Sequence, residues 1–347
     1  MPRIVRRICQ ILYVFICLIL VFSALLIGMV IYFNRPPASM PPSAENGTVL
    51  FEIRRGESAQ SVGRRLEQEG IIRNRYFWYL LSRLEKEYVK TGAYRLELPA
   101  TQLAIHAVLV EGRQILNRVT IPEGVTIKKI ARILEEANIC GAADFIAAAA
   151  DRALLDRYHI PASTMEGYLF PETYLFPVDY PPSMVITAMA DTFFRRLGEI
   201  VPSGGEPDPE ELHRKVVLAS IVEREYRIDE EAPLMAGVFD NRLRIGMALQ
   251  SCATVEYVIT EIQDRPHPEI LYTRDTEIRD PYNTYMYPGL PPGPISNPGE
   301  VALRAGFFPR ESDYLYFRLT DPAAGRHYFA RTLDDHIRAG LLYVKGR

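Results

Sequence analysis

Two neighbouring carboxylates offer the clearest chemistry in this sequence. Residues 215–226 read KVVLASIVEREY, so a run that is apolar on nearly every side ends at Glu223 and Glu225. Such a run predicts a buried helix, and a carboxyl group at its end loses hydration. Because desolvation raises the pKa of a carboxyl group, it can hold a proton near neutral pH and act as a general acid. A plainer interpretation stays open, in which the helix surfaces here and the carboxylates pair with Arg224 or Arg227.

Neutral polar and aromatic residues follow in two short blocks. Residues 282–285 read YNTY, and residues 289–299 read GLPPGPISNPG. The second block is too rich in proline and glycine for the interior of a helix or strand, so it predicts a rigid irregular loop. Tyr, Asn, Thr and Gln side chains beside it suit a sugar polymer, whose hydroxyl and N-acetyl groups they can bond. The sequence has no phosphate-binding glycine loop, Ser–His–Asp order or zinc motif, and we expect neither a metal nor a cofactor.

The elements that must position these residues belong to a globular protein of ordinary composition. The 347 residues are 48% hydrophobic and 24% charged, which excludes a disordered or collagen-like chain. The net charge of −3 gives no support for binding to nucleic acid. Four cysteines in a chain of this size do not indicate a disulfide framework.

The N-terminus predicts a membrane anchor. Residues 8–33 contain no charged side chain, and a helix of this length is about 39 Å long, enough to span a bilayer with tilt. The run is too long for a cleaved signal peptide, and no small-x-small cleavage site follows it. Arg3, Arg6 and Arg7 precede the run, so we expect the N-terminus in the cytoplasm and residues 36–347 outside the cytoplasmic membrane, in the periplasm. Residues 35–48 are rich in Pro, Ser and Ala and predict an extended spacer.

A strand, a turn and a helix recur in one pattern at residues 53–66, 96–109 and 121–134. In each segment an apolar residue precedes a turn former, a Ser or Thr that can cap a helix, and apolar residues at a spacing of four. The turn former is Gly56, Pro99 or Gly124. Two interpretations stay open: any junction between a strand and a helix resembles this, or residues 49–139 form a small α/β module of related units.

Six segments closely resemble the endolytic murein transglycosylases, the YceG-like family. These segments are EGYLFPETY (166–174), LASIVERE (218–225), GVFDNRL (237–243), MALQ (247–250), YNTY (282–285) and GLPPGPISNPG (289–299). The N-terminal span and the α/β module also match, so the resemblance covers nearly the whole chain. It implies an α+β fold with four parts: an N-terminus and single transmembrane helix (1–34), a linker (35–48), a LysM-like α/β module (49–139) and a mixed α+β catalytic domain (140–347).

The resemblance also implies an activity. Enzymes of this family cleave the β-1,4 bond between N-acetylmuramic acid and N-acetylglucosamine within a peptidoglycan strand. The C6 hydroxyl of the muramic sugar attacks C1, so no water is used and a 1,6-anhydro end remains. The catalytic Glu of the family falls on Glu223, and Gln250, Asn283, Tyr285 and Glu166 match positions expected to bind substrate. The implied partners are glycan strands, the cytoplasmic membrane and peptidoglycan synthases, whose strand elongation the cleavage would end.

The effect of one departure from the family pattern stays open, and so do two rival functions. The family usually has Asp-Pro where this chain has Cys252 and Ala253, after Gln250 and Ser251. If that Asp only shapes a turn, activity survives, whereas an Asp that positions sugar or Glu223 would make this chain differ in rate or preference. The rival functions are a non-catalytic scaffold that binds the cell wall and a glycoside hydrolase that uses water. The products of peptidoglycan digestion would separate all three.

Overall fold

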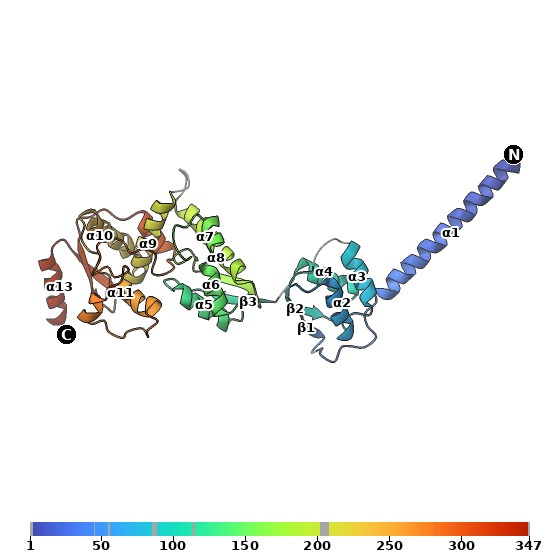
Figure 1. Ribbon diagram of the computed structural model, residues 1–347, viewed down its shortest axis with the longest axis horizontal. Helices are drawn as coiled ribbons and strands as arrows, with labels where there is room; N and C mark the ends of the chain where they lie inside the picture. The colour runs from blue at the N-terminus through green and yellow to red at the C-terminus, as the bar shows by residue number, and fades with distance from the viewer. Residues whose placement is uncertain are drawn as a thin grey trace. The chain divides into compact units, whose positions relative to one another are not determined.

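The computed structural model describes residues 3–44, 46–54, 56–84, 89–112, 115–201 and 208–345 (Figure 1). The chain divides into two compact units, residues 1–116 and 117–347. The described residues form helices and three two-stranded sheets, which pair β1 with β2, β3 with β4 and β5 with β6. The fold is therefore mixed α+β, as the sequence predicts.

The first unit begins with a long apolar helix, α1 (Arg3–Phe33). Within it, the 22 residues from Leu12 to Phe33 are long and apolar enough to cross a membrane, and none is buried against protein. Apolar side chains that find no protein core fit a lipid-facing surface, so α1 fits a membrane anchor.

A small α/β module follows α1 in the same unit. Its elements are β1 (Thr48–Ile53), α2 (Ala59–Gln68), α3 (Arg75–Leu84), β2 (Gly92–Glu97) and α4 (Gln102–Glu111). The strands β1 and β2 are antiparallel, with register from Thr48↔Glu97 to Ile53↔Gly92. Alternate side chains of β1 point into the core, where they meet the apolar faces of the helices. This core contains Val49, Phe51, Ile53, Val62, Leu66, Trp78, Tyr94, Leu96, Ile105 and Leu109.

The predicted strand, turn and helix are found in all three segments. Ser58, Thr101 and Thr126 are N-caps, and each side chain accepts a hydrogen bond from the backbone N–H three residues later. Gly56 and Gly124 have φ angles of +77° and +73°, a region that favours glycine, so the turns require this residue type. The local pattern in the sequence thus determines where each helix begins.

The third segment packs in the second unit and not with the other two. It comprises β3 (Leu116–Thr120) and α5 (Ile127–Glu136). Its apolar side chains, among them Val119, Ile130 and Leu134, join the core that contains Phe145 and Phe193. The compact units therefore meet at 116/117, whereas the module predicted from the sequence ends at residue 139.

The segment after α1, which its composition predicts to be an extended spacer, contacts the module at two residues. Pro41 is buried and lies against Gly70, and Ala44 packs on the core of the module. Leu98 N donates to Gly47 O at 2.7 Å. Pro41 and Ala44 of the expected spacer therefore contact the module, and the linker itself stays a prediction.

The second unit contains the remaining elements. They are α6 (Ala142–Ala149), α7 (Arg152–Arg157), β4 (Thr173–Pro177), α8 (Pro182–Ile200), α9 (Pro209–Glu225), η1 (Asp229–Glu231), α10 (Ala232–Arg244), α11 (Cys252–Tyr257), η2 (Val258–Ile262), η3 (Thr273–Glu277), α12 (Glu300–Phe307), β5 (Tyr316–Asp321), β6 (Arg326–Ala330) and α13 (Leu333–Lys345).

Helix α9 is shared by two hydrophobic cores. Val216 and Ala219 belong to the core of α5, α6 and α8, whereas Val217 and Ile221 belong to a core with α10 and α11. All seven residues from Val216 to Val222 are buried. A helix packed on several sides must be apolar on several sides, which accounts for the run in the sequence.

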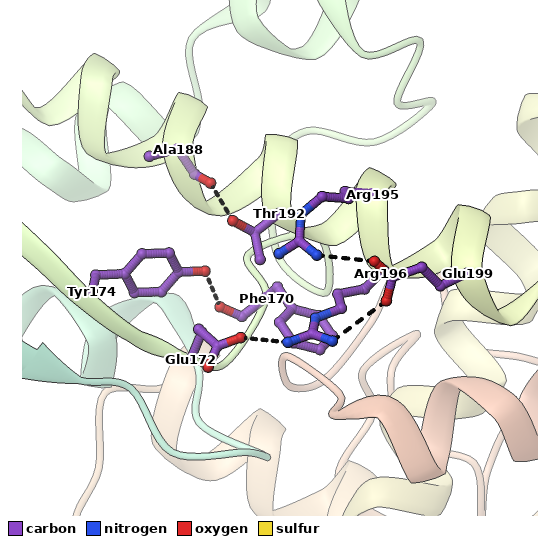
Figure 2. Close-up of polar contacts among 8 residues, drawn as sticks. All are labelled: Phe170, Glu172, Tyr174, Ala188, Thr192, Arg195, Arg196 and Glu199. Atoms are coloured by element: carbon purple, nitrogen blue, oxygen red, sulfur yellow. Dashed lines mark hydrogen bonds and ion pairs between the residues drawn. The ribbon is translucent and has the colours of Figure 1, made fainter.

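Polar contacts fix the segment 166–174 to α8 (Figure 2). Arg196 Nη2 lies 2.9 Å from Glu172 Oε2, and its guanidinium lies over the Phe170 ring. Tyr174 Oη donates to Phe170 O at 2.7 Å. These contacts, together with a hydrogen bond from Ile121 N to Glu172 O, hold the segment beside the turn that precedes α5.

Candidate active site

Glu223 lies near the C-terminal end of α9, where the helix leaves the core. Its side chain is partly buried, and its Oε2 accepts a hydrogen bond from Gly299 N at 2.9 Å. Burial raises the pKa of Glu223 to about 8, the Gly299 bond opposes this rise, and the nearby charge of Glu123 adds to it. Glu223 therefore holds a proton at neutral pH, which is the property that its place on an apolar helix predicts.

Two glycines bring backbone close to this carboxyl group. A Cβ atom at Gly124 would lie 3.4 Å from Glu223 Cγ. A Cβ atom at Gly299 would overlap the carboxyl group of Glu123, which therefore lies directly against Gly299. Glu123 is thus a second carboxyl group beside Glu223, and it was not predicted from the sequence. The sequence feature that could have indicated Glu123 is its place directly before Gly124, the turn glycine of the third strand–turn–helix segment.

The side-chain amide of Asn297 joins three segments around Glu223. Its Oδ1 accepts from Gly167 N and Leu169 N, both at 3.0 Å. Its Nδ2 donates to Val125 O at 3.0 Å and to Glu166 Oε1 at 2.8 Å. Asn297 is fully buried, so these contacts replace the hydration that the amide loses. We did not predict this role, although Asn297 lies in the proline-rich loop that the sequence singles out.

Glu166 and Asn283, both predicted to bind substrate, are buried residues bonded to backbone. The carboxylate oxygens of Glu166 accept from Ile127 N, each at 3.1 Å. Asn283 Nδ2 donates to Thr276 O at 3.0 Å and to Ile278 O at 2.7 Å. Their contacts hold the start of α5 and the loop at 276–285, respectively.

A wide cleft opens beside Glu223, and we call it the Glu223 cleft. Its volume is about 930 Å³. One wall is the turn before α5 together with α5 itself, and the other follows η2. Lys128 Nζ donates to Asp264 Oδ1 at 2.9 Å and so ties the two walls together. The lining residues are 122–126, Lys128, Lys129, Arg132, Ile133, Glu136, Glu223, Arg224, Thr260, Glu261 and 264–267.

A second cleft, the Glu225 cleft, opens on another side of the same helix end. It has a volume of about 460 Å³ and is lined by Glu225, Gln250 and Tyr285, whereas Glu223 is not among its lining residues. Arg224 lines both clefts. The predicted binding residues Gln250 and Tyr285 therefore lie together, but in a different cleft from the predicted acid.

The segment that departs from the family lies in the Glu225 cleft. Ser251 Oγ donates to Glu225 Oε1, and burial raises the pKa of Glu225 while this bond opposes the rise. Cys252 Sγ lies 3.1 Å from Tyr285 Oη. Gln250 has a φ angle of +50°, an uncommon conformation for a residue other than glycine, and its side chain is exposed.

The arrangement offers one chemical capability above others. A partly buried carboxyl group that is protonated at neutral pH faces a cleft wide enough for several sugar rings. Such a group can donate a proton to a leaving oxygen and then act as a base. Among the described residues, no group of His, Cys, Asp and Glu could hold a metal ion.

Comparisons with known proteins agree on one family. The sequence model of the YceG-like family matches residues 51–340. A protein of Bacillus subtilis (strain 168), named endolytic murein transglycosylase, is 29% identical over 317 residues, which cover 86% of each chain. A Streptococcus pneumoniae (strain R6) protein of the same name is 29% identical over 327 residues, or 86% of this chain and 59% of that protein.

A solved structure also resembles this chain. The crystal structure of a putative yceG-like protein from Listeria monocytogenes matches with a TM-score of 0.55 and 29% sequence identity. The match covers 84% of this chain and 98% of that one.

Asn297→Ala should destabilise the second unit strongly. The change leaves the N–H groups of Gly167 and Leu169 without their partner, at a cost of about 3 kcal/mol or more in the free energy of unfolding. Asn117→Ala is the matched control, because Asn117 donates one bond, to Ala137 O, from a partly buried position, and its loss should cost about 1 kcal/mol. Denaturant unfolding of the detergent-solubilised chain measures both, and equal losses would contradict the role of Asn297.

Proposed function

The chain belongs to the YceG-like family, and from this we propose that it is a membrane-anchored, endolytic lytic transglycosylase of peptidoglycan. The observation that carries the proposal is Glu223, whose pKa of about 8 keeps a proton beside a cleft of about 930 Å³. The relatives named endolytic murein transglycosylase support the same activity.

In the proposed reaction Glu223 acts first as an acid and then as a base. Its proton goes to the glycosidic oxygen that leaves C1 of N-acetylmuramic acid, and the bond from C1 to this oxygen breaks. The C6 hydroxyl of the same sugar forms the new bond to C1 and gives its proton to the Glu223 carboxylate. The enzyme returns to its starting state, and the strand carries a 1,6-anhydro end. One carboxyl group serves both steps, so no second catalytic carboxylate is required.

The hydrogen bond from Gly299 suits this cycle. Because Gly299 N donates to Oε2, we propose that Glu223 carries its proton on Oε1 and donates it to the substrate from there. After proton transfer, the same N–H stabilises the carboxylate. The bond therefore lowers the cost of losing the proton, while burial keeps the proton in place beforehand.

In the proposed complex the glycan strand occupies both clefts. The reacting bond lies in the Glu223 cleft, and Gln250 and Tyr285 bind sugars further along the strand in the Glu225 cleft. Glu166 and Asn283 contribute through the backbone segments that they hold in place. Replacement of Gln250 by Ala tests this division: we expect weaker binding of long strands, and unchanged binding would contradict it.

The topology proposed for the chain places the enzyme outside the cytoplasm. We propose that α1 is a single membrane span with the N-terminus in the cytoplasm, that the module at β1–β2 is LysM-like, and that the second unit is catalytic and periplasmic. A phosphatase reporter fused after the last residue should be active, because this enzyme matures only outside the cytoplasm. Activity of a cytoplasmic reporter at the same position would contradict the topology.

Glu223→Gln should abolish the formation of anhydro ends. Glutamine keeps the shape of the side chain but cannot supply the proton, so we expect a loss of about 10²–10⁴-fold or more in the rate of cleavage. Mass spectrometry of digested peptidoglycan measures the products. Reducing ends in place of anhydro ends would indicate a hydrolase, and the absence of cleavage by the unaltered protein would indicate a scaffold.

Glu225→Gln is the control for the choice between the two carboxylates. Glu225 lines the other cleft and bonds Ser251, so we expect a smaller loss of cleavage rate with an unchanged product. A larger loss than that of Glu223→Gln, with the fold intact, would reverse the assignment.

The dependence of activity on pH should show the effect of Glu123 on the pKa of Glu223. The charge of Glu123 raises the pKa of Glu223, so Glu123→Gln should lower that pKa. Because the acid must be protonated, the alkaline fall in kcat/KM, expected near pH 8, should then move to lower pH. Glu136→Gln is the matched control, since Glu136 lines the same cleft without contributing to the pKa of Glu223. An unmoved profile, or equal shifts in both variants, would contradict the role of Glu123.

A further inference from the structure

Helix α3 has two apolar faces, and the module covers only one of them. Phe77, Trp78 and Leu81 are buried. On the opposite side, Tyr76, Tyr79, Leu80 and Leu84 are exposed, and Tyr76 and Leu84 are 69% and 68% accessible. Their spacing of three and four residues places them along one stripe of the helix. A contiguous apolar stripe of this kind marks an interaction surface more often than isolated exposed residues do.

The helix that bears the exposed stripe lies beside the end of the proposed membrane span. The rings of Phe33, the last residue of α1, and Phe77 stack with centroids 6.4 Å apart. The guanidinium of Arg73, just before α3, lies 4.8 Å from the ring centroid of Tyr32. Leu103 N, at the start of α4, donates to Asn34 Oδ1 at 3.0 Å. In Figure 1, α3 accordingly lies next to the C-terminal end of α1.

The side chains along this stripe have the chemistry of the boundary between lipid and water. Tyrosine collects at that boundary because its ring is apolar and its hydroxyl group is polar. The guanidinium groups of Arg75 and Arg83 lie over the rings of Tyr76 and Tyr79. Arginine side chains there can reach anionic headgroups while their apolar stems stay near the acyl chains.

We propose that the stripe Tyr76, Tyr79, Leu80 and Leu84 docks on the lipid surface at the outer end of α1, so that the module rests on the membrane. The proposal rests on α1 being a membrane span. It commits to lipid because the helix that bears the stripe contacts the end of the span through Phe77, and because Arg75 and Arg83 flank the tyrosine side chains of the stripe. A second copy of the chain, or another protein, would cover the stripe without contact with lipid.

A fluorescent probe on the full chain tests the proposal. Leu80→Cys places the probe on the stripe, in a chain whose four native cysteines are replaced by serine. Leu50→Cys is the matched control, because Leu50 is also exposed but belongs to β1, where its neighbours Val49 and Phe51 face the helices and it faces away. Each labelled protein is reconstituted in vesicles of phosphatidylethanolamine and phosphatidylglycerol that contain lipids with a nitroxide near the headgroup.

We expect the Leu80 probe to emit at shorter wavelength and to be quenched severalfold more strongly than the Leu50 probe. A second labelled site on the stripe, Leu84→Cys, should behave like Leu80 and guards against a local disturbance. Equal quenching of the Leu80 and Leu50 probes would overturn the proposal. A shielded probe that the nitroxide lipids do not reach would also overturn it, in favour of a protein occupant.

Washing the vesicles with alkaline carbonate separates this inference from the proposed anchor. Protein that is released shows that α1 does not span the membrane, and the docking proposal falls with it. Protein that stays in the vesicles, with a water-exposed probe at Leu80, leaves the anchor standing and overturns docking alone. The proposed reaction at Glu223 does not enter either outcome.

Discussion

One buried amide holds the candidate active site together. Asn297 joins the turn before α5, the turn at Gly167–Leu169 and the proline-rich loop, and that loop presents Gly299 to Glu223. An amide without partners in this position would be costly, so the four contacts act as a set. The position of Gly299 therefore depends on hydrogen bonds between segments that are far apart in the sequence. The pKa of Glu223 depends on them too, because the Gly299 N–H bonds its carboxyl group.

The packing of helix α9 determines the surroundings of Glu223 and Glu225 at its C-terminal end. Because both faces of the helix are packed, its last turn has a fixed orientation, and successive carboxylates point into different clefts. Glu223 meets a backbone N–H and a neighbouring carboxyl group, whereas Glu225 meets the Ser251 hydroxyl. Two residues of the same type, separated by one position, thus acquire different hydrogen-bond partners and line different clefts because of the packing of a single helix.

The sequence was informative where the physical signal is local. The apolar run of α1, the caps at Ser58, Thr101 and Thr126, and the buried middle of α9 each follow from neighbouring residues. Packing partners are not local, and so the contacts of Pro41 and Ala44 with the module were not expected. The third strand–turn–helix segment was expected to belong to the module, although it packs in the second unit.

For the same reason the sequence identified Glu223 as a candidate acid but missed Glu123 and Asn297, whose roles arise only when separate turns meet.

The double packing of α9 also bears on how the second unit can evolve. A change in side-chain volume at Val216 is felt by one core, and a change at Val217 is felt by the other, so each face limits what the other can accept. The helix that carries the proposed acid should consequently tolerate few substitutions. Exposed residues in the cleft walls, such as Lys129 and Arg132 on α5, are not limited by packing in either core. Substitutions in the cleft walls can therefore change substrate preference without disturbing the packing that positions Glu223. Specificity and reactivity can thus evolve separately.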